Sequence, residues 1–429
     1  EIIRMLAQPH NNICVVGDDS QTIFSFRGAS WKYMVNFNQV YPNCTSIVMD
    51  INYRSTPSIV GLGNSIIHRN EKQIKKTLKS VIPTSNLVKY ATPLTSDIEA
   101  DEIVSDIQDK RNMGLSLAEI SVIYRTHATG RAIFDKLLLA DIPFVTYGKS
   151  NESFYQNTFI RPVMALLRVT VNSSDMNAIE ESAPLFYISK ADMRRTLEEI
   201  VMNYNGEIPK ELFKLTMKKI ADTKSGFQQR QLITKMDAVQ KLKSMTTPAA
   251  IREIRKGTFG YESQLEVDGR KTISIAKEMM LEILDEFEQA SRGFKDIQAF
   301  LTFVARVEEK NAEMEELRNQ PDIQAVRLMT IHASKGLEFD VVYAIGWSEG
   351  ILPHAASLDT EKKEDSPLPP EEAIAEERRL AYVCVTRARQ HLYISSPQNH
   401  RNEKVHPSRF IVEGMGMESI HTKKEGRKL

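Results

Sequence analysis

Cysteine is scarce in this chain. Only three cysteines occur among the 429 residues, Cys14, Cys44 and Cys384, and they lie far apart without a Cys-x-x-Cys pair. This spacing excludes a disulfide framework and argues against a structural zinc site. We therefore expect a protein of the reducing cytoplasm.

Long hydrophobic runs and net charge are absent as well. No run of about 18 apolar residues occurs, so the sequence predicts neither a membrane-spanning helix nor a membrane partner. The 56 basic and 56 acidic residues cancel, which excludes a global polycation, so any contact with nucleic acid must come from local patches. A starting methionine is also lacking, and residues 1–7 have the pattern of a helix already in progress. We expect a piece of a longer protein.

Short apolar runs followed by polar loops are present, and they predict parallel strands of an α/β domain. They lie at Ile13–Val16, Ser46–Met49, Ile120–Tyr124, Phe144–Tyr147, Val326–Ile331, Val341–Ile345 and Leu392–Ile394. Between residues 155 and 320, apolar residues recur instead at helical spacing, as in Ala276–Gln289 and Phe300–Leu317. The sequence therefore predicts a helical domain inserted into an α/β one, with a surface loop at Thr360–Pro370 and a polar tail after Gly414.

The run Thr330–Phe339 places His332, Lys335 and Glu338 around one glycine, between two predicted strands. Functional loops of open α/β sheets lie at such strand ends. A loop of this composition can hold a nucleotide and a nucleic acid together, but taken alone it is equally well a polar turn between core strands.

Two loops near the N-terminus combine amide, aromatic and arginine side chains. Gln21 can hydrogen-bond a phosphate or orient an attacking water, and of Phe24 and Phe26 one can stack on a base while the other packs in the core. Tyr53 stands beside Arg54, so a base can stack on the ring while the guanidinium holds its phosphates. A surface cation–π pair is the plainer alternative.

Arg387 follows a predicted helix that begins near Glu376 and has an apolar face of Leu380, Ala381, Val383 and Cys384. The helix dipole favours a cation at this end, so a solvated structural arginine is one interpretation. The other is an arginine finger that completes a phosphate site.

Together the motifs stand in the order Gly-Asp-x-x-Gln, Asn-Tyr-Arg-Ser, Tyr-Arg-Thr, Thr-x-His-x-x-Lys-Gly-Leu-Glu-Phe and Glu-Glu-Arg-Arg-Leu-Ala-Tyr-Val-x-x-Thr-Arg-Ala. In this order they resemble the UvrD/Rep/PcrA group of superfamily 1 DNA helicases, over residues 1–167 and 322–396. The resemblance implies two RecA-like domains with ATP in the cleft between them, and movement 3′ to 5′ along one DNA strand.

The resemblance also implies roles for single residues. Gln21, Arg54 and Arg387 would act at the γ-phosphate, Tyr53 would stack on adenine, and Glu338 would bind the ribose. Residues on the DNA side would be Phe24, Phe26, Arg27, His127, His332 and Lys335, with Phe26 stacking on the single strand and His127 standing where relatives often carry an asparagine.

The predicted fold class is α/β, a RecA-like parallel-sheet domain with a helical insert and a remnant of the first RecA-like domain. The predicted boundaries are 1–52 for that remnant, 53–154 and 321–414 for the second RecA-like domain, 155–320 for the insert and 415–429 for the tail. The resemblance implies single-stranded DNA, junctions of single- and double-stranded DNA, ATP and accessory repair or replication proteins as partners.

Parts that a helicase of this kind needs are missing from these 429 residues. ATP and Mg²⁺ require a Walker A loop, G-x-x-x-x-G-K-[ST], and an acidic Asp-Glu pair, and neither pattern occurs. The Gly-Lys-Ser at Gly148–Ser150 has Pro143 where the first glycine should stand. The chain thus resembles a helicase from which most of the first RecA-like domain has been removed. We expect that this polypeptide alone does not hydrolyse ATP.

The insert departs from the group as well. Relatives carry a Gly-Ile-Gly turn that grips duplex DNA, where this chain has Pro184–Asp192, so that grip is not carried over. A different class of function stays open: a nonenzymatic DNA-binding or partner-docking module from a degenerate homologue. A helicase–nuclease is disfavoured, because no acidic cluster with a lysine follows Ser396.

Overall fold

The computed structural model describes residues 5–10, 12–83, 86–147, 153–268, 274–318, 323–358, 369–400 and 403–417. The chain divides into two compact units. Unit 1 comprises Glu1–Ala91, Ile331–Ser396 and His406–Leu429, and unit 2 comprises Thr92–Thr330 and Pro397–Val405. Each unit is therefore built from segments that are distant in sequence.

Unit 1 contains three parallel strands in the order β3 (Lys89–Ala91), β8 (Ala388–Ser395), β7 (Phe339–Ala344). Val341, Val342 and Leu392 are buried in this sheet, as apolar runs in parallel strands require. A separate parallel pair joins β1 (Ile51–Asn52) to β2 (Lys79–Ser80).

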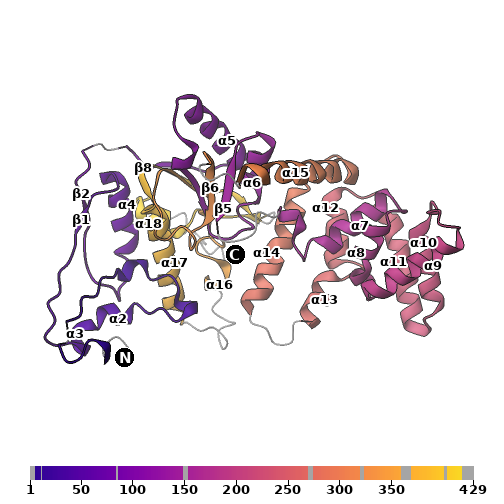
Figure 1. The fold of residues 1–429 in the computed structure, drawn as a ribbon, viewed down its shortest axis with the longest axis horizontal. Coiled ribbons are helices and arrows are strands. Elements are labelled where there is room, and N and C mark those ends of the chain that lie inside the picture. The colour runs from indigo at the N-terminus through magenta and orange to yellow at the C-terminus, as the bar shows by residue number, and fades with distance from the viewer. Residues whose placement is uncertain are drawn as a thin grey trace, which may run out of the picture. The chain divides into compact units, whose positions relative to one another are not determined.

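Helices pack around these strands in unit 1. The longest is α17 (Pro370–Val385), which packs on α4 (Pro57–Ile67), and α18 (Arg409–Gly414) packs on the same helix (Figure 1). Both α4 and α17 begin at a proline, whose fixed φ suits the first helical turn. The remaining short helices are η1 (Asp19–Gln21), η2 (Ser25–Arg27), α2 (Lys32–Val35), α3 (Phe37–Val40) and α16 (Ala355–Leu358).

Unit 2 contains, among its described residues, three parallel strands in the order β4 (Ile120–Tyr124), β6 (Val326–Thr330), β5 (Phe144–Tyr147). Every residue of β4 is buried. The helices α5 (Ser96–Asn112), α6 (Arg131–Leu139) and α15 (Ile297–Arg318) accompany these strands, with α6 packed on both other helices. The remaining short elements here are η3 (Leu117–Glu119), β9 (Asn399–His400) and β10 (Glu403–Lys404).

The middle of unit 2 is helical. Neighbouring helices α8 to α11 pack in sequence order and lie side by side in Figure 1. The elements are η4 (Phe154–Gln156), α7 (Arg161–Val171), α8 (Met176–Glu181), η5 (Ala183–Phe186), α9 (Lys190–Asn203), α10 (Leu212–Asp222), α11 (Gly226–Leu242), α12 (Thr247–Lys256), α13 (Tyr261–Asp268) and α14 (Ser274–Ala290). This confirms the predicted helical texture between residues 155 and 320.

The mixed α/β class with parallel strands is confirmed, and so are five of the predicted strands, as β4, β5, β6, β7 and β8. The strands predicted at Ile13–Val16 and Ser46–Met49 are wrong. Neither run is a strand, and both are largely exposed, with Val16 at 85%. A buried parallel strand needs hydrogen-bonded neighbours, and among the described residues neither run has one.

Several predictions fall outside the described residues. They concern Gly148–Ser150, nearly all of Thr360–Pro370, most of the tail and half of residues 1–7. Within the described part of the chain, no helix is long and apolar enough to cross a membrane.

Candidate nucleotide and nucleic-acid site

The loop Ile331–Glu338 leads directly into β7 and folds as consecutive turns. Ser334 Oγ donates to the carbonyl of Ile331 at 2.8 Å, and the amide of Leu337 donates to the carbonyl of Ser334 at 3.0 Å. Gly336 has φ of 92°, a left-handed conformation that favours glycine. This geometry places Lys335 and Glu338 on either side of that glycine.

One end of the loop joins an aromatic cluster, which we define as Phe24, Arg27, His332 and Lys335. The rings of Phe24 and His332 lie 5.7 Å apart, and Lys335 Nζ lies 5.4 Å from the centroid of the Phe24 ring. The Arg27 guanidinium lies 5.5 Å from the same centroid. Desolvation, with a contribution from Arg387, lowers the pKa of Lys335. The cluster thus combines stacking surface with three groups that can carry positive charge.

The other end joins an arginine cluster, which we define as Arg54, Glu338, Arg387 and Arg389. Arg54 Nε lies 3.1 Å from a Glu338 carboxylate oxygen, and Arg389 Nη1 lies 3.8 Å from the other. Asn52 shapes the Arg54 loop, because its side chain accepts hydrogen bonds from the amides of Arg54 and Ser55, both at 2.9 Å. The ion pair holds two residues that the sequence predicts at a nucleotide.

Arg387 is buried, with 4% of its side chain exposed, so it is not a solvated arginine. Its Nε and Nη1 donate to the carbonyls of Val383 and Leu337, and its Nη2 donates to Thr386 Oγ1. Burial, together with the nearby Arg54, lowers the pKa of Arg387. A guanidinium has five N–H groups, so two have no partner among the described residues and can donate to an anion.

Gln21 lies at the end of η1 and is oriented by a carboxylate. Its Nε2 donates to Asp18 Oδ2 at 2.7 Å, and Lys76 Nζ contacts both Asp18 and Asp19, the latter at 3.2 Å. Burial lowers the pKa of Lys76, but attraction to the two carboxylates outweighs it and raises that pKa overall. Asp18 therefore fixes the amide of Gln21 in one orientation.

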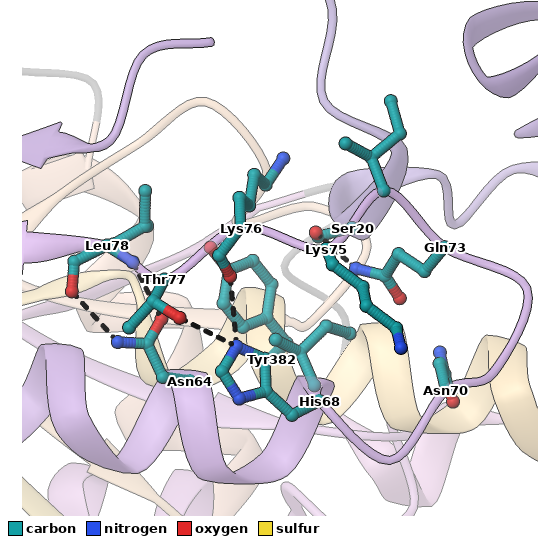
Figure 2. A pocket seen from close by; sticks show the side chains of 12 residues that line it. Ser20, Asn64, His68, Asn70, Gln73, Lys75, Lys76, Thr77, Leu78 and Tyr382 are labelled. Atoms are coloured by element: carbon teal, nitrogen blue, oxygen red, sulfur yellow. Dashed lines mark hydrogen bonds between the residues drawn. The ribbon is translucent and has the colours of Figure 1, made fainter.

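A cavity of about 370 Å³ lies beside this group, between α4, the segment after it and Tyr382 of α17. Figure 2 shows His68 pointing at the backbone of Lys76, where its Nε2 lies 2.9 Å from the carbonyl oxygen, and Gln73 reaching the hydroxyl of Ser20. The Gln73 contact ties this segment to η1, and the His68 contact holds the backbone of Lys76, which pairs with Asp18.

The remaining predicted residues are not all gathered here. Tyr53 is 69% exposed next to the arginine cluster, which leaves its ring open to a base. Phe26 lies in η2, but its side chain is outside the described part. His127 belongs to unit 2, where its ring lies 6.2 Å from that of Tyr124.

The sequence did not point to Asp18, Lys76 or Arg389 as members of the site. Lys76 lies in a segment without a motif, more than fifty residues from the carboxylates that it contacts. Arg389 directly follows the last quoted motif, which ends at Ala388, and its Nε donates to Asp340 Oδ1 at 2.8 Å. Among the described residues, no group of three or more potential ligands could hold a metal ion.

The sequence matches two protein-family models. Residues 47–399 match the UvrD-like helicase C-terminal domain, and residues 1–42 match the UvrD/REP helicase N-terminal domain.

Three relatives of similar sequence are named as DNA helicases. The chain is 34% identical to the putative ATP-dependent DNA helicase YjcD of Bacillus subtilis, over 96% of this chain and 51% of that protein. It is 31% identical to DNA helicase II of Rickettsia typhi, over 96% of this chain and 60% of the relative. It is 27% identical to the ATP-dependent DNA helicase PcrA of Staphylococcus epidermidis, over 96% of this chain and 55% of that protein. The chain thus spans between half and two thirds of the length of these relatives.

Proposed function

Because the chain belongs to the UvrD-like helicase family, we propose that it supplies the nucleotide-sensing and strand-contacting residues of an ATP-dependent DNA helicase. The helicase would track 3′ to 5′ on single-stranded DNA and unwind duplex DNA at junctions with single strands, in repair or replication in the cytoplasm. Accessory proteins of those processes would be its partners.

One observation supports this proposal above the others. The loop Ile331–Glu338 joins the arginine cluster at one end and the aromatic cluster at the other, within unit 1. Glu338 is therefore only a few residues from Lys335 and His332, so a change of partner at Glu338 would act on the same loop that carries them. Such a connection is what a motor needs to couple nucleotide state to its grip on a strand.

The arginine cluster has the chemistry to bind a nucleotide. Arg54 and Arg387 would contact the γ-phosphate, which is the group on which guanidinium charge acts in phosphoryl transfer. Arg54 would exchange its Glu338 partner for phosphate oxygens, and Glu338 would then accept hydrogen bonds from the ribose. Tyr53 would stack on adenine, and Gln21, held by Asp18, would hydrogen-bond the γ-phosphate or the attacking water.

The aromatic cluster has the chemistry to bind a single strand. Bases stack on aromatic rings, and cations beside them neutralise the backbone phosphates. Phe24, Arg27, His332 and Lys335 would make these contacts, together with Phe26 of η2 and His127 of unit 2. Because phosphate contacts supply most of the affinity, binding should weaken steeply with salt.

Hydrolysis needs groups that residues 1–429 do not contain. The absence of a Walker A pattern and of a metal-binding group among the described residues does not fit a bound Mg²⁺, so no step is assigned to the metal. We therefore expect no ATP turnover by this polypeptide, measured as DNA-stimulated phosphate release and compared with its Arg387→Ala variant. Turnover well above that control would contradict the proposal.

The domain boundaries at residues 52, 154, 320 and 414 are part of the same proposal. Residues 1–52 would belong to the first RecA-like domain, 53–154 and 321–414 to the second, 155–320 to the insert and 415–429 to a tail. Limited proteolysis would test them, with early cleavage expected near residues 154 and 320.

A second candidate is a nonenzymatic DNA-binding or partner-docking module from a degenerate homologue. The missing Walker A and Asp-Glu patterns are the observation that favours it. Sequencing of the gene upstream of the codon for Glu1 separates the two candidates. Both patterns are expected there for a helicase, and neither for a degenerate homologue.

A further inference from the structure

A second pocket, of about 320 Å³, lies in the helical part of unit 2, between η5 and α11. This volume is at the lower end of the range of ligand pockets. Its floor includes the buried residues Ile188 and Leu232, whereas Tyr187 and Phe227 are 67% and 65% exposed at its edge. Two large exposed aromatic side chains beside an apolar hollow are typical of a binding surface.

Lys235 of α11 lines the same pocket and is only 5% exposed. Its Nζ donates to the carbonyls of Leu185 and Phe259, at 2.6 and 3.3 Å, and lies 4.2 Å from the centroid of the Tyr187 ring. No carboxylate in the described part of the chain forms an ion pair with it. Burial of a charge without a counter-charge is unfavourable, and burial lowers the pKa of Lys235 to about 8.

The rest of the lining has the same character. Lys224, Gln228 and Gln231 are exposed, and no acidic residue takes part. The pocket therefore presents two lysines, hydrogen-bonding amides and aromatic rings. This composition is complementary to a ligand that has an apolar group and a negative charge close together.

The backbone presents one of the two rings. Tyr187 follows η5 with φ of 57°, in the left-handed region that bulky residues rarely adopt. Its amide donates to the carbonyls of Ala183 and Pro184, which ends η5 at this point. Because of this turn, the Tyr187 ring lies over Lys235.

Several cations near the pocket are already held by carboxylates, whereas the apolar hollow calls for an apolar group that a phosphate backbone does not offer. Four basic residues in this part of unit 2 have a carboxylate partner: Lys190 with Glu181, Arg194 with Glu180, Arg195 with Asp192 and Lys219 with Glu199. The two lysines that line the pocket, Lys224 and Lys235, form no ion pair with a carboxylate of the described residues, and the charge of Lys235 lies buried behind the Tyr187 ring. An acidic protein segment fits this arrangement better than duplex DNA does.

We propose that the pocket docks an acidic peptide segment of a protein partner. One aromatic or aliphatic side chain of the segment enters between Tyr187 and Phe227, and a neighbouring carboxylate pairs with Lys235. The site does not depend on the motor chemistry proposed above, since every residue in it belongs to the helical part of unit 2.

Fluorescence anisotropy on the full chain tests this proposal. The probes are three labelled peptides with blocked ends, each with one Trp, Phe or Leu between short runs of Glu, and matched peptides with Ala at the centre or Lys in the flanks. At least one acidic peptide should bind, and its alanine- and lysine-containing counterparts should bind at least tenfold more weakly.

Variants locate the binding. Lys235→Met keeps the apolar stem and removes the charge, and it should weaken binding at least tenfold. Phe227→Ser, at an exposed position, should do the same without disturbing the fold. Lys241→Met is the matched control, because Lys241 is exposed on the same helix and does not line the pocket, and it should leave the affinity unchanged.

The pH dependence provides a second readout. The titratable groups that line the pocket with Lys235 are Lys224 and Tyr187. Since the pKa of Lys235 is about 8 in the free protein and a bound carboxylate raises it, affinity should fall about tenfold from pH 7 to pH 9. Lys235→Met should abolish this dependence. The proposal is wrong if none of the acidic peptides binds, or if Phe227→Ser and Lys235→Met leave binding intact. It is equally wrong if a duplex oligonucleotide, rather than a peptide, loses affinity in both variants.

Discussion

At the scale of single residues, the candidate site holds its charged groups through backbone contacts and short ion pairs. Arg387 is fixed by the carbonyls of Val383 and Leu337, so its position does not depend on an acidic partner. Arg54 is instead held by Glu338 and stays largely exposed. A pre-positioned arginine beside one that can change partner is a suitable arrangement for sensing a phosphate.

Lys335 is the residue whose DNA contact is simplest to test. Substitution Lys335→Met should weaken binding of a labelled oligo(dT) and reduce the slope of log affinity against log salt by about one. The control is Lys79→Met, because Lys79 is exposed on β2 and belongs to neither cluster. An unchanged slope in the Lys335 variant, or an equal change in the control, would show that Lys335 does not contact the backbone.

The sequence offered candidate site residues where a motif stood next to a strand end. The pattern of motifs pointed to Glu338, Arg54 and Arg387 through its resemblance to the helicase group. It could not point to Lys76, whose role depends on a loop that returns to Asp18 and Asp19 over more than fifty residues. Nor could it show that Arg54 and Glu338 pair, since nothing local encodes that contact.

At the scale of elements, two buried groups of charged side chains join helices of unit 2 to one another. One is centred on Arg255 of α12, which contacts Glu262 of α13 at 2.6 Å and Glu288 of α14 at 2.9 Å, as well as Asp285. Removal of a buried charge leaves its partners uncompensated, which costs far more than the pair contributes.

Arg255→Met should therefore lower the free energy of unfolding by about 3–5 kcal/mol. Arg252→Met, which removes an exposed partner of the same Glu288, should cost less than about 1 kcal/mol. Urea unfolding followed by the helical circular dichroism signal measures both. Equal costs for the two variants would show that burial of Arg255 contributes nothing.

The second ionic group joins α6 to α14. Arg131 donates to Glu286 at 2.8 Å, and Tyr155 donates to Asp135 at 2.8 Å. Burial outweighs the attraction of Arg131 and raises the pKa of Glu286 from its usual 4.5 to about 7, and that of Asp135 to about 6. Both carboxyl groups thus keep their protons up to a higher pH in the folded chain than in the unfolded chain.

The sign of the pH effect follows from these raised values. The stability that protonated Glu286 contributes is fully present below its unfolded pKa of 4.5 and is lost as pH rises through 7. The amide side chain introduced by Glu286→Gln cannot ionise. The difference in thermal midpoint between this variant and the parent should therefore increase in the variant's favour as pH rises from 4.5 to 7. Glu309→Gln, at an exposed position, should show no such trend. A midpoint difference for Glu286→Gln that is independent of pH would contradict the raised pKa.

Strands show how far the sequence alone predicts elements. Apolar runs such as Ile120–Tyr124 became β4 because β6 lies beside it as a hydrogen-bonding neighbour. The equally apolar Ile13–Val16 and Ser46–Met49 did not become strands, because a run of apolar residues does not encode its neighbour. Helical spacing needs no distant partner, and the helices α14 and α15 match their predicted ranges closely.

At the scale of the whole molecule, a net charge of zero coexists with local positive charge. The 56 basic and 56 acidic residues balance, yet Lys335 and Arg27 both lie over the Phe24 ring. Association with DNA would then depend on this local cluster rather than on long-range attraction. The account's central claim is accordingly that the two ends of the loop Ile331–Glu338 serve different ligands.

Photo-cross-linking tests that claim most directly. A single-stranded oligonucleotide containing iodouracil would be irradiated with the purified chain, and the modified peptides identified by mass spectrometry. The account predicts adducts on peptides that contain Phe24 or His332, and their loss when an unlabelled single strand competes. Adducts confined to the peptide with Tyr53 and Arg54, or no specific adduct at all, would contradict it.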